Sequence, residues 1–198
     1  MSLMEYISTQ PLDSSGGAGK YHGAVAHGYD AKREQSPKWF LEQNIIEDML
    51  SDLPKGSWVL DCPCGTGRFF GFYHKKGFIF RGIDRSVDML RHAADKVIDP
   101  MTARLAEGDV RALPAPDKCV DASIMCRLTR WLSPADCQQA MRELQRVSRQ
   151  KIIFTARVAN HQHARTIDLF ESALNGWKIA RNEAGADIDY RVIELRPC

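Results

Sequence analysis

Short apolar runs alternate with helical patterns from residue 57 onward, and this order most constrains what the chain folds into. Val- and Ile-rich runs separated by helices are typical of parallel strands that helices cover on both faces. The runs are 57–61, 79–84, 103–106, 122–126 and 152–156. Two further β-like stretches, 177–182 and 190–195, are separated by a short turn-rich segment, so we expect them to pair antiparallel. The sequence predicts an α/β fold whose parallel sheet ends in a hairpin.

Helix signals fill the gaps between these runs. Ser133 followed by Pro134 marks a helix start, because serine caps free backbone N–H groups and proline fits the first helical position. A second helix follows Ser86, a third covers 37–50, and a fourth is expected over about 164–174. These helices are the expected cover for the sheet.

Length and composition fit one globular domain. The 198 residues are 44% hydrophobic, enough for a core without metal or disulfide staples. With 27 Lys and Arg against 25 Asp and Glu, the net charge of +2 gives no sign of general binding to nucleic acid or membranes. No run reaches the ~18 apolar residues of a membrane span, and the N-terminus lacks a secretory pattern, so we expect a cytoplasmic protein. The oligomeric state stays open.

The six cysteines do not form C-x-x-C pairs, and no histidine pair completes a zinc set. We interpret them as reduced thiols and expect no metal site. Cys62 and Cys64 are two residues apart at the end of a strand, on either side of a proline. Alternation along the strand would send their side chains to opposite faces of the sheet, which argues against a shared metal.

A glycine loop follows the first strand, where the eight residues from Asp61 read D-C-P-C-G-T-G-R. Glycines at a strand-to-helix turn let the backbone approach a ligand closely, and the N–H groups of a helix start favour an anionic group. The second strand ends in Asp84, seventeen residues after Gly67, where an acid is placed to accept hydrogen bonds from both hydroxyls of a ribose. The third leads into Asp109 and Val110, placed to contact the edge of an adenine. We therefore expect an adenosine-containing ligand at the carboxyl edge of the sheet.

Four motifs in order resemble those of class I S-adenosylmethionine-dependent methyltransferases. They read V-L-D-C-P-C-G-T-G-R-F, G-I-D-R-S-V-D-M-L, A-E-G-D-V-R-A-L-P and V-D-A-S-I-M-C-R-L-T-R-W-L, and the resemblance extends from about Tyr29 to Leu195. Within this family the chain is similar to the small-molecule methyltransferases of the ubiquinone-biosynthesis-like branch. The resemblance implies S-adenosylmethionine as cofactor and a Rossmann-like, mostly parallel sheet of seven strands. It also implies the order 3-2-1-4-5-7-6, with strand seven antiparallel and helices on both faces.

The resemblance also assigns cofactor contacts. It places the methionine part over the glycine loop, the ribose at Asp84, and the adenine beside Met89. The implied cofactor-binding residues are Tyr29, Arg33, Asp61, Cys64, Gly65, Thr66, Gly67, Asp84, Arg85, Met89, Asp109, Val110 and Cys126. The chain departs from the family pattern in two places: Pro63 stands where the glycine loop usually has a small residue, and the insertion after strand five is nearly absent.

The resemblance to the family also implies a division of the chain into two parts. Tyr29 and Arg33 belong to the stretch V-A-H-G-Y-D-A-K-R, which resembles the N-terminal lid of the family. Residues 13–20 read D-S-S-G-G-A-G-K, a flexible linker by composition. We therefore expect residues 1–40 to be a linker and cofactor lid, and residues 41–198 to be the methyltransferase domain.

Arginines follow several predicted strands at the ligand edge: Arg85, Arg111, Arg127, Arg130 and Arg157. Arginine binds carboxylates and phosphates bidentately, so we expect a small anionic acceptor. We expect the last three of these arginines to bind it.

Methyl transfer from a sulfonium needs an acceptor in line with the methyl group more than it needs a covalent intermediate. The catalytic residue is left unknown. An oxygen acceptor would benefit from a base, for which His161 and His163 are the candidates, with His22 and His27 as alternatives in the lid.

Other protein classes share some of these features. A dinucleotide dehydrogenase would share the glycine spacing, but the terminal hairpin, the acid at Asp109 and the lack of a Tyr-x-x-x-Lys pair favour the methyl donor. Pro63-Cys64 is not the Pro-Cys nucleophile of cytosine methylation, because it follows strand one and not strand four. A nucleic-acid methyltransferase and a non-catalytic, cofactor-binding partner subunit stay open as alternatives.

Overall fold

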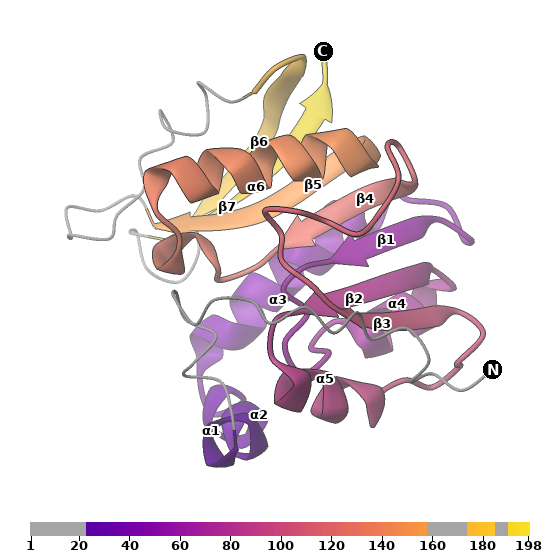
Figure 1. Cartoon of the computed structure of the whole chain (residues 1–198), viewed down its shortest axis with the longest axis vertical. Coiled ribbons are helices and arrows are strands. Elements are labelled where there is room, and N and C mark those ends of the chain that lie inside the picture. The colour runs from indigo at the N-terminus through magenta and orange to yellow at the C-terminus, as the bar shows by residue number, and fades with distance from the viewer. Residues whose placement is uncertain (1–22, 158–173, 185–189) are drawn as a thin grey trace.

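A computed structural model of the chain describes residues 23–157, 174–184 and 190–198 (Figure 1). The helices are α1 (Ala24–His27), α2 (Tyr29–Arg33), α3 (Pro37–Leu50), α4 (Phe70–Lys76), α5 (Val87–Ala94) and α6 (Pro134–Val147). The strands are β1 (Trp58–Asp61), β2 (Ile79–Asp84), β3 (Ala103–Glu107), β4 (Val120–Met125), β5 (Ser148–Arg157), β6 (Trp177–Ala184) and β7 (Tyr190–Pro197). A 3-10 turn over Thr129–Trp131 follows β4.

These strands form one seven-stranded sheet in the order β3-β2-β1-β4-β5-β7-β6. Parallel pairing joins β1 to β2 and β4, β2 to β3, and β4 to β5, whereas β7 runs antiparallel to both β5 and β6. The predicted fold class, the strand order and the antiparallel seventh strand are therefore confirmed.

Two helix starts confirm the capping predictions. The hydroxyl of Ser86 accepts a hydrogen bond from the N–H of Met89 at 3.3 Å, and that of Ser133 accepts one from the N–H of Asp136 at 3.1 Å. Each bond satisfies a backbone donor that the first turn of a helix leaves unpaired. Ser133 is followed by Pro134 at the first helical position, as expected.

One strand boundary differs from the prediction. β5 begins at Ser148, four residues before the predicted start at Ile152, because the chain passes from α6 into the strand without a loop. Ser148 pairs with Val120, and a register shift follows between Val120 and Ala122. The Ser148 hydroxyl donates to Ser123 Oγ at 2.7 Å within the sheet, which gives a buried polar group its partner. The helix predicted over 164–174 lies outside the described residues, apart from Leu174.

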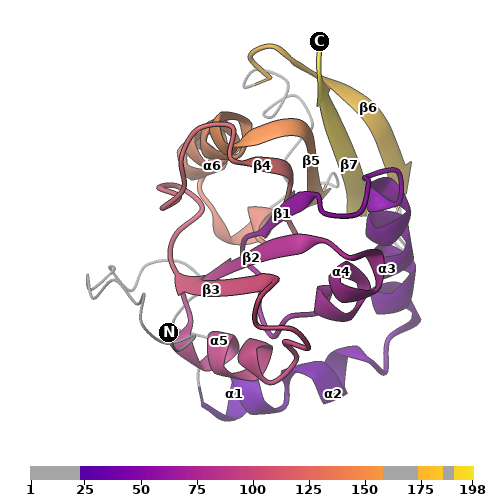
Figure 2. The same ribbon diagram turned by 90° about the vertical axis from the view of Figure 1, so that its right-hand side faces the viewer.

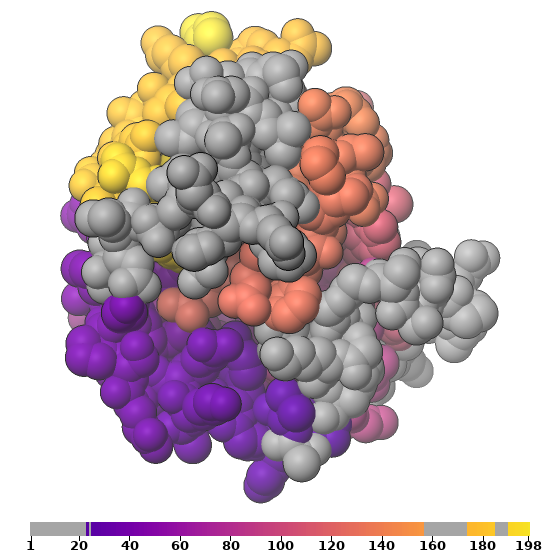
Figure 3. Space-filling model, turned by 90° about the vertical axis from the view of Figure 1, so that its left-hand side faces the viewer, coloured from indigo at the N-terminus to yellow at the C-terminus, as the bar shows by residue number. Residues whose placement is uncertain are grey.

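Helices cover both faces of the sheet, as predicted. Consecutive residues of β1 point to opposite sides: Val59 joins a core with α3, α4 and α5, whereas Leu60 joins a core with α6. In Figure 2, α6 lies on one side of the strands and α3 and α4 lie on the other. Figure 3 shows the N-terminal helices in indigo on the same face of the molecule as the C-terminal strands in yellow. No helix among the described residues is long and apolar enough to cross a membrane.

Candidate functional site

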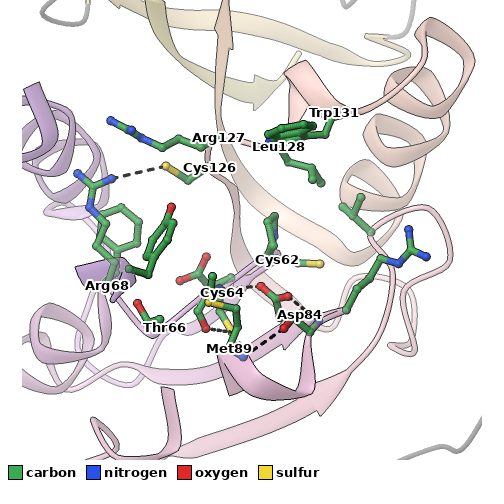
Figure 4. Close-up of a pocket in the computed structure, with 18 of the residues that line it drawn as sticks. Cys62, Cys64, Thr66, Arg68, Asp84, Met89, Cys126, Arg127, Leu128 and Trp131 are labelled. Carbon is green, nitrogen blue, oxygen red and sulfur yellow. Dashed lines mark hydrogen bonds between the residues drawn. The ribbon is translucent and has the colours of Figure 1, made fainter. Parts of the chain in front are cut away.

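A cavity of about 350 Å³ opens where the carboxyl ends of β1, β2 and β4 meet (Figure 4). Most of the predicted site residues line it: Tyr29, Arg33, Asp61, Cys64, Gly65, Thr66, Asp84, Arg85, Met89, Asp109, Val110, Cys126, Arg127 and Arg130. Gly67 shapes the loop beneath these residues but is not part of the lining. The sequence therefore located the cavity, although the chain positions involved are spread over a hundred residues.

Other candidates are not among the residues that the structure shows lining the cavity. His22, His161 and His163 lie outside the described residues. Arg157 ends β5, but its side chain is not described. His27 is exposed on α1, with its ring 5.7 Å from that of His92, and is not among the residues that line the cavity. The assignment of a base to any of these histidines stays a prediction.

The glycine loop has the backbone that its sequence predicts. Gly65 and Gly67 have φ angles of +55° and +77°, in the left-handed region where residues with a Cβ are strained. A Cβ on Gly67 would also lie 2.7 Å from the ring of Phe70. The loop is tied to the next strand, because the Gly65 N–H donates to Asp84 Oδ2 at 2.8 Å and the Ser86 N–H to Asp84 Oδ1 at 2.9 Å. Asp84 thus fixes the loop and faces the cavity.

Asp61 lies under the loop at the end of β1. It is 1% exposed, and the Tyr73 hydroxyl donates to its Oδ2 at 3.1 Å. Burial raises the pKa of Asp61 to about 7, and the charge of Asp84 adds to the rise, while Tyr73 and Arg68 oppose it. Asp61 is therefore a buried acid whose ionisation falls near neutral pH.

Asp109 is held by arginines. Arg111 donates from Nε to Oδ1 at 3.0 Å and from Nη2 to Oδ2 at 2.6 Å, and Arg85 Nε lies 3.6 Å from Oδ2. Burial raises the pKa of Asp109, but the hydrogen bonds and charge of Arg111 outweigh this effect and leave the pKa below its ordinary value. Arg111 also pairs with Asp136 at 3.0 Å. Arg111 therefore positions Asp109 and does not line the cavity.

The cysteines follow the alternation that was predicted. Cys62 packs in the core beside α6, whereas Cys64 packs in the core beside α3, α4 and α5. Burial raises the pKa of both thiols and of Cys126, so all three stay protonated at neutral pH. Among the described residues, no group of three His, Cys, Asp or Glu side chains is placed to hold a metal ion.

The opposite wall of the cavity is aromatic and basic, and most of it was missed from the sequence. We call it the arginine side, made of Trp39, Glu42, Arg68, Arg127, Leu128, Arg130, Trp131 and Tyr190. The glycine loop with Asp61, Asp84 and Asp109 is called the acidic side. In Figure 4, Asp84 and Met89 lie at one end of the cavity, and Arg127, Leu128 and Trp131 lie at the other.

Glu42 organises the arginine side from α3. It is 1% exposed, and its Oε2 accepts hydrogen bonds from Arg68 Nη1 at 2.7 Å and from Arg127 Nε at 2.6 Å. Arg68 also donates to the carbonyl of Trp39 and stacks on its ring, with Cζ 3.5 Å from the centroid. The apolar face of α3 signals a core helix, so a buried glutamate within it gives no sequence signal of this network.

Arg127 occupies an unusual backbone position at the end of β4. Its φ is +58°, rare for a residue with a Cβ, and its N–H donates to Thr155 Oγ1 at 2.7 Å. The Tyr190 hydroxyl lies 2.8 Å from the same Thr155 oxygen. Burial raises the pKa of Tyr190 well above its ordinary value, so its hydroxyl stays protonated. Three strand ends, β4, β5 and β7, thus meet at this part of the wall.

The N-terminal helices contact the acidic side. Asp30 on α2 accepts a hydrogen bond from Thr66 Oγ1 at 2.5 Å and pairs with Lys96 at 2.5 Å. The Gly23 N–H donates to Asp88 on α5 at 2.9 Å. Tyr29 lies edge-on to Trp39, with ring centroids 6.1 Å apart. The segment that the sequence predicts as a lid therefore reaches both sides of the cavity.

The chain is similar to known methyltransferases. A family described as a methyltransferase domain matches residues 59–151. The malonyl-[acyl-carrier protein] O-methyltransferase of Pectobacterium atrosepticum is 32% identical over 116 residues, which are 55% of this chain and 42% of that protein. An uncharacterised protein of Methanocaldococcus jannaschii is 29% identical over 144 residues, 73% of this chain and 52% of that protein. The chain thus spans about half the length of these relatives.

Solved structures share the whole fold. The magnesium protoporphyrin IX methyltransferase of Synechocystis, solved with bound S-adenosylhomocysteine, superposes with a TM-score of 0.69 at 14% identity, and the match covers 90% of this chain and 91% of that one. The seven-stranded sheet and the glycine loop define a Rossmann-like nucleotide-binding domain. Together with the methyltransferase-domain match, they make the chain similar to the class I S-adenosylmethionine-dependent methyltransferases.

Proposed function

We propose that this protein is an enzyme that transfers the methyl group of S-adenosylmethionine to a small anionic acceptor. The observation that carries the proposal is the division of one cavity into two sides. The acidic side presents a glycine loop and carboxylates at three strand ends, and the arginine side presents Arg127 and Arg130 across from them. A cationic sulfonium suits the first side and an anionic acceptor suits the second.

The residues fit the cofactor in a definite order. Gly65, Thr66 and Gly67 would lie beneath the methionine part, with Asp61 under the loop. Asp84 would hold the ribose, since its carboxylate faces the cavity at the end of β2. Met89, Asp109 and Val110 would surround the adenine, with Arg85 beside Asp109. The backbone at Cys126 and the side chains of Cys64, Tyr29 and Arg33 would complete the set.

The acceptor would enter between the aromatic rings of the arginine side. In-line transfer requires its nucleophilic atom about 3 Å from the methyl carbon, so placement by the cavity walls can supply most of the rate enhancement. The Pectobacterium relative is named for O-methylation of a malonyl group, which supports a small acyl acceptor here. Membership of the ubiquinone-biosynthesis-like branch and a cytoplasmic location remain predictions.

Residues 1–40 would act as a lid on residues 41–198. The contact between Asp30 and Thr66 supports this, because it joins the N-terminal helices to the glycine loop. Lid closure would exclude water from the reacting centre.

Calorimetry with S-adenosylmethionine and, in parallel, NAD tests the proposal. We expect micromolar binding of the methyl donor, no binding of NAD, and a higher melting temperature with the donor present. Binding of NAD alone would overturn the assignment. Substrate-dependent release of S-adenosylhomocysteine then separates an enzyme from a cofactor-binding partner subunit, and addition of RNA or DNA as acceptor tests the nucleic-acid alternative.

A further inference from the structure

Arg127 is held so that only part of its guanidinium is used by the fold. Its backbone N–H is bound to Thr155, and its Nε is bound to Glu42. In the part of the chain that the structure describes, its two terminal amino groups form no hydrogen bond, and the residue lines the cavity. The guanidinium carbon lies 5.0 Å from the ring centroid of Trp39 and 5.8 Å from that of Tyr190. The Nε edge of the guanidinium is therefore fixed by Glu42, and the edge with the two terminal amino groups is available to a ligand in the cavity.

The charges around Glu42 do not balance. One carboxylate faces two guanidinium groups, since both Arg68 and Arg127 pair with Glu42. Arg68 donates hydrogen bonds to Glu42, to the Trp39 carbonyl and to Gln43. The excess positive charge is thus presented by the terminal amino groups of Arg127. A partly desolvated guanidinium with two parallel donors favours a planar carboxylate, which it binds bidentately.

The strained backbone of Arg127 also supports a functional role for its side chain. The left-handed backbone at this position would be relaxed for glycine and is strained for arginine. Strain of this kind persists where the side chain is needed, and it clusters at functional sites. Within the fold the side chain pairs with Glu42 through Nε, and its terminal amino groups face the cavity side of the residue.

The described acids and thiols of the cavity are poor bases for an acceptor. Asp84 accepts two backbone N–H groups, Asp109 is held by Arg111, and Glu42 is shared by two arginines. Asp61, whose pKa is about 7, is 1% exposed on the acidic side of the cavity, where it accepts a hydrogen bond from the Tyr73 hydroxyl. No histidine is among the described residues that line the cavity. A phenol, alcohol or ammonium group must lose a proton before or during attack, whereas a carboxylate is already ionised at neutral pH.

We propose that the acceptor is a carboxylic acid, that its carboxylate is held by the terminal amino groups of Arg127, and that the product is a methyl ester. This inference rests on the proposed methyltransferase function. A carboxylate oxygen forms a bond to the methyl carbon while the bond from that carbon to the sulfonium sulfur breaks. The sulfur keeps the electron pair, so a neutral thioether and a neutral ester leave the site, and no proton is transferred. Trp39, Leu128 and Trp131 would contact the apolar body of the acid.

A base-lability assay tests the chemistry of the acceptor without knowledge of its name. The full chain is incubated with S-adenosylmethionine tritiated in the methyl group and the small-molecule fraction of a cell extract, and the products are then treated with alkali. Methyl esters of carboxylic acids release volatile tritiated methanol, whereas methyl groups on nitrogen, carbon, phenolic oxygen or phosphate stay attached. We expect most of the transferred label to be released as methanol.

Variants at Arg127 test the residue. Arg127→Gly relieves the backbone strain and removes the guanidinium, and Arg127→Lys keeps the charge but not the paired donors. We expect transfer to fall about 10- to 100-fold in both, with S-adenosylmethionine affinity changed less than about threefold. Arg142→Met serves as the control, since Arg142 is exposed on α6 and its side chain donates hydrogen bonds to Gln139.

The outcomes separate the two proposals. A base-stable product would overturn the carboxylate inference and leave the methyltransferase function standing. An equal loss of cofactor affinity and of transfer in Arg127→Gly would also overturn it, because Arg127 would then hold the cofactor's own carboxylate. Failure to form any labelled product from the extract, in a protein that binds the methyl donor, would count against enzymatic function itself.

Discussion

The two sides of the cavity are built by different means. The acidic side consists of short segments that each follow a strand of the parallel sheet, and its bonds join residues that the topology makes neighbours, as Gly65 and Asp84 are. The arginine side depends on pairs far apart in the chain: Glu42 and Arg127 are 85 residues apart, and Thr155 and Tyr190 are 35 apart. The motifs of the sequence include the bonded partners of the first arrangement, whereas for the second they include Arg68 and Arg127 but not the shared partner Glu42.

The difference also concerns energy. Backbone donors and glycine conformations form the acidic side, so most of its geometry is fixed by the fold itself. The arginine side buries ionised groups that stabilise one another only as a set, because a buried charge without its partner is strongly destabilising. The comparison predicts that single changes on the arginine side cost more stability, and that changes on the acidic side cost more cofactor affinity.

The largest effect is expected for Glu42→Ala. This change leaves the guanidinium groups of Arg68 and Arg127 without their shared carboxylate, and the Arg68 side chain is only 7% exposed. We expect the free energy of unfolding to fall by about 3 to 5 kcal/mol, measured by urea denaturation. Asp48→Ala is the matched control on the same helix, because Asp48 is exposed and pairs with Arg181 at the surface. The control should cost less than about 1 kcal/mol. Equal losses in the two variants would show that the buried network is no more important than a surface pair.

On the acidic side, Asp84→Ala should act mainly on the cofactor. Removal of the carboxylate leaves two ribose hydroxyls without a charged acceptor, and charge-assisted hydrogen bonds are worth roughly 1.5 to 3 kcal/mol. We expect S-adenosylmethionine to bind more than about tenfold more weakly by calorimetry. Asp95→Ala, at an exposed position after α5, should bind normally. Undiminished affinity in a folded Asp84→Ala variant would place the ribose elsewhere.

The acidic side could be predicted from the sequence more fully than the arginine side. The parallel strands, the terminal hairpin, the Gly65–Gly67 turn and the three acids were all predicted, because hydrophobic periodicity and strand-end chemistry are local properties. Arg127 was predicted from its place after a strand. Its partner Glu42 was not, since a single glutamate in an amphipathic helix is usually exposed to solvent. The early start of β5 was missed because Ser148–Lys151 is polar and lacks the apolar signal of a strand.

The pH dependence of stability sharpens the description of Asp61. Its pKa is raised from 3.8 to about 7 in the folded protein, first by burial and then by the charge of Asp84. The folded state therefore binds more protons than the unfolded state between these values, so the contribution of Asp61 to stability falls as pH rises from 3.8 to about 7. We expect a slope of at most ~1.4 kcal/mol per pH unit that Asp61→Asn removes.

Denaturation of both proteins at several pH values between 4 and 8 measures this slope as a difference. Other titrating groups contribute equally to the two curves and cancel. The positive charges of the methyl donor should favour ionised Asp61, so its affinity is expected to rise with pH in the same window for the wild type only. Parallel stability curves for the wild type and Asp61→Asn would mean that Asp61 ionises normally.

The smallest effect is expected where the N-terminal helices meet the acidic side. Asp30 bonds to Thr66 and Lys96, and both Asp30 and Lys96 are partly exposed, so the three groups should contribute no more than about 1 kcal/mol to stability. If α2 closes over the cofactor, Asp30→Ala should nevertheless weaken S-adenosylmethionine binding several-fold, because closure then costs free energy that the wild type does not lose. Thr66→Val breaks only the hydrogen bond and Lys96→Ala only the ion pair, so the two together divide the effect of Asp30 between the loop and α5. Glu34→Ala is the control, as Glu34 is exposed at the end of the same helix.

Hydrogen exchange of residues 23–36 should slow when the donor binds to the wild type and slow less in Asp30→Ala. Identical affinities and identical exchange in all five proteins would show that the N-terminal helices are a fixed part of the wall and not a lid, and the acidic side would then be complete without them.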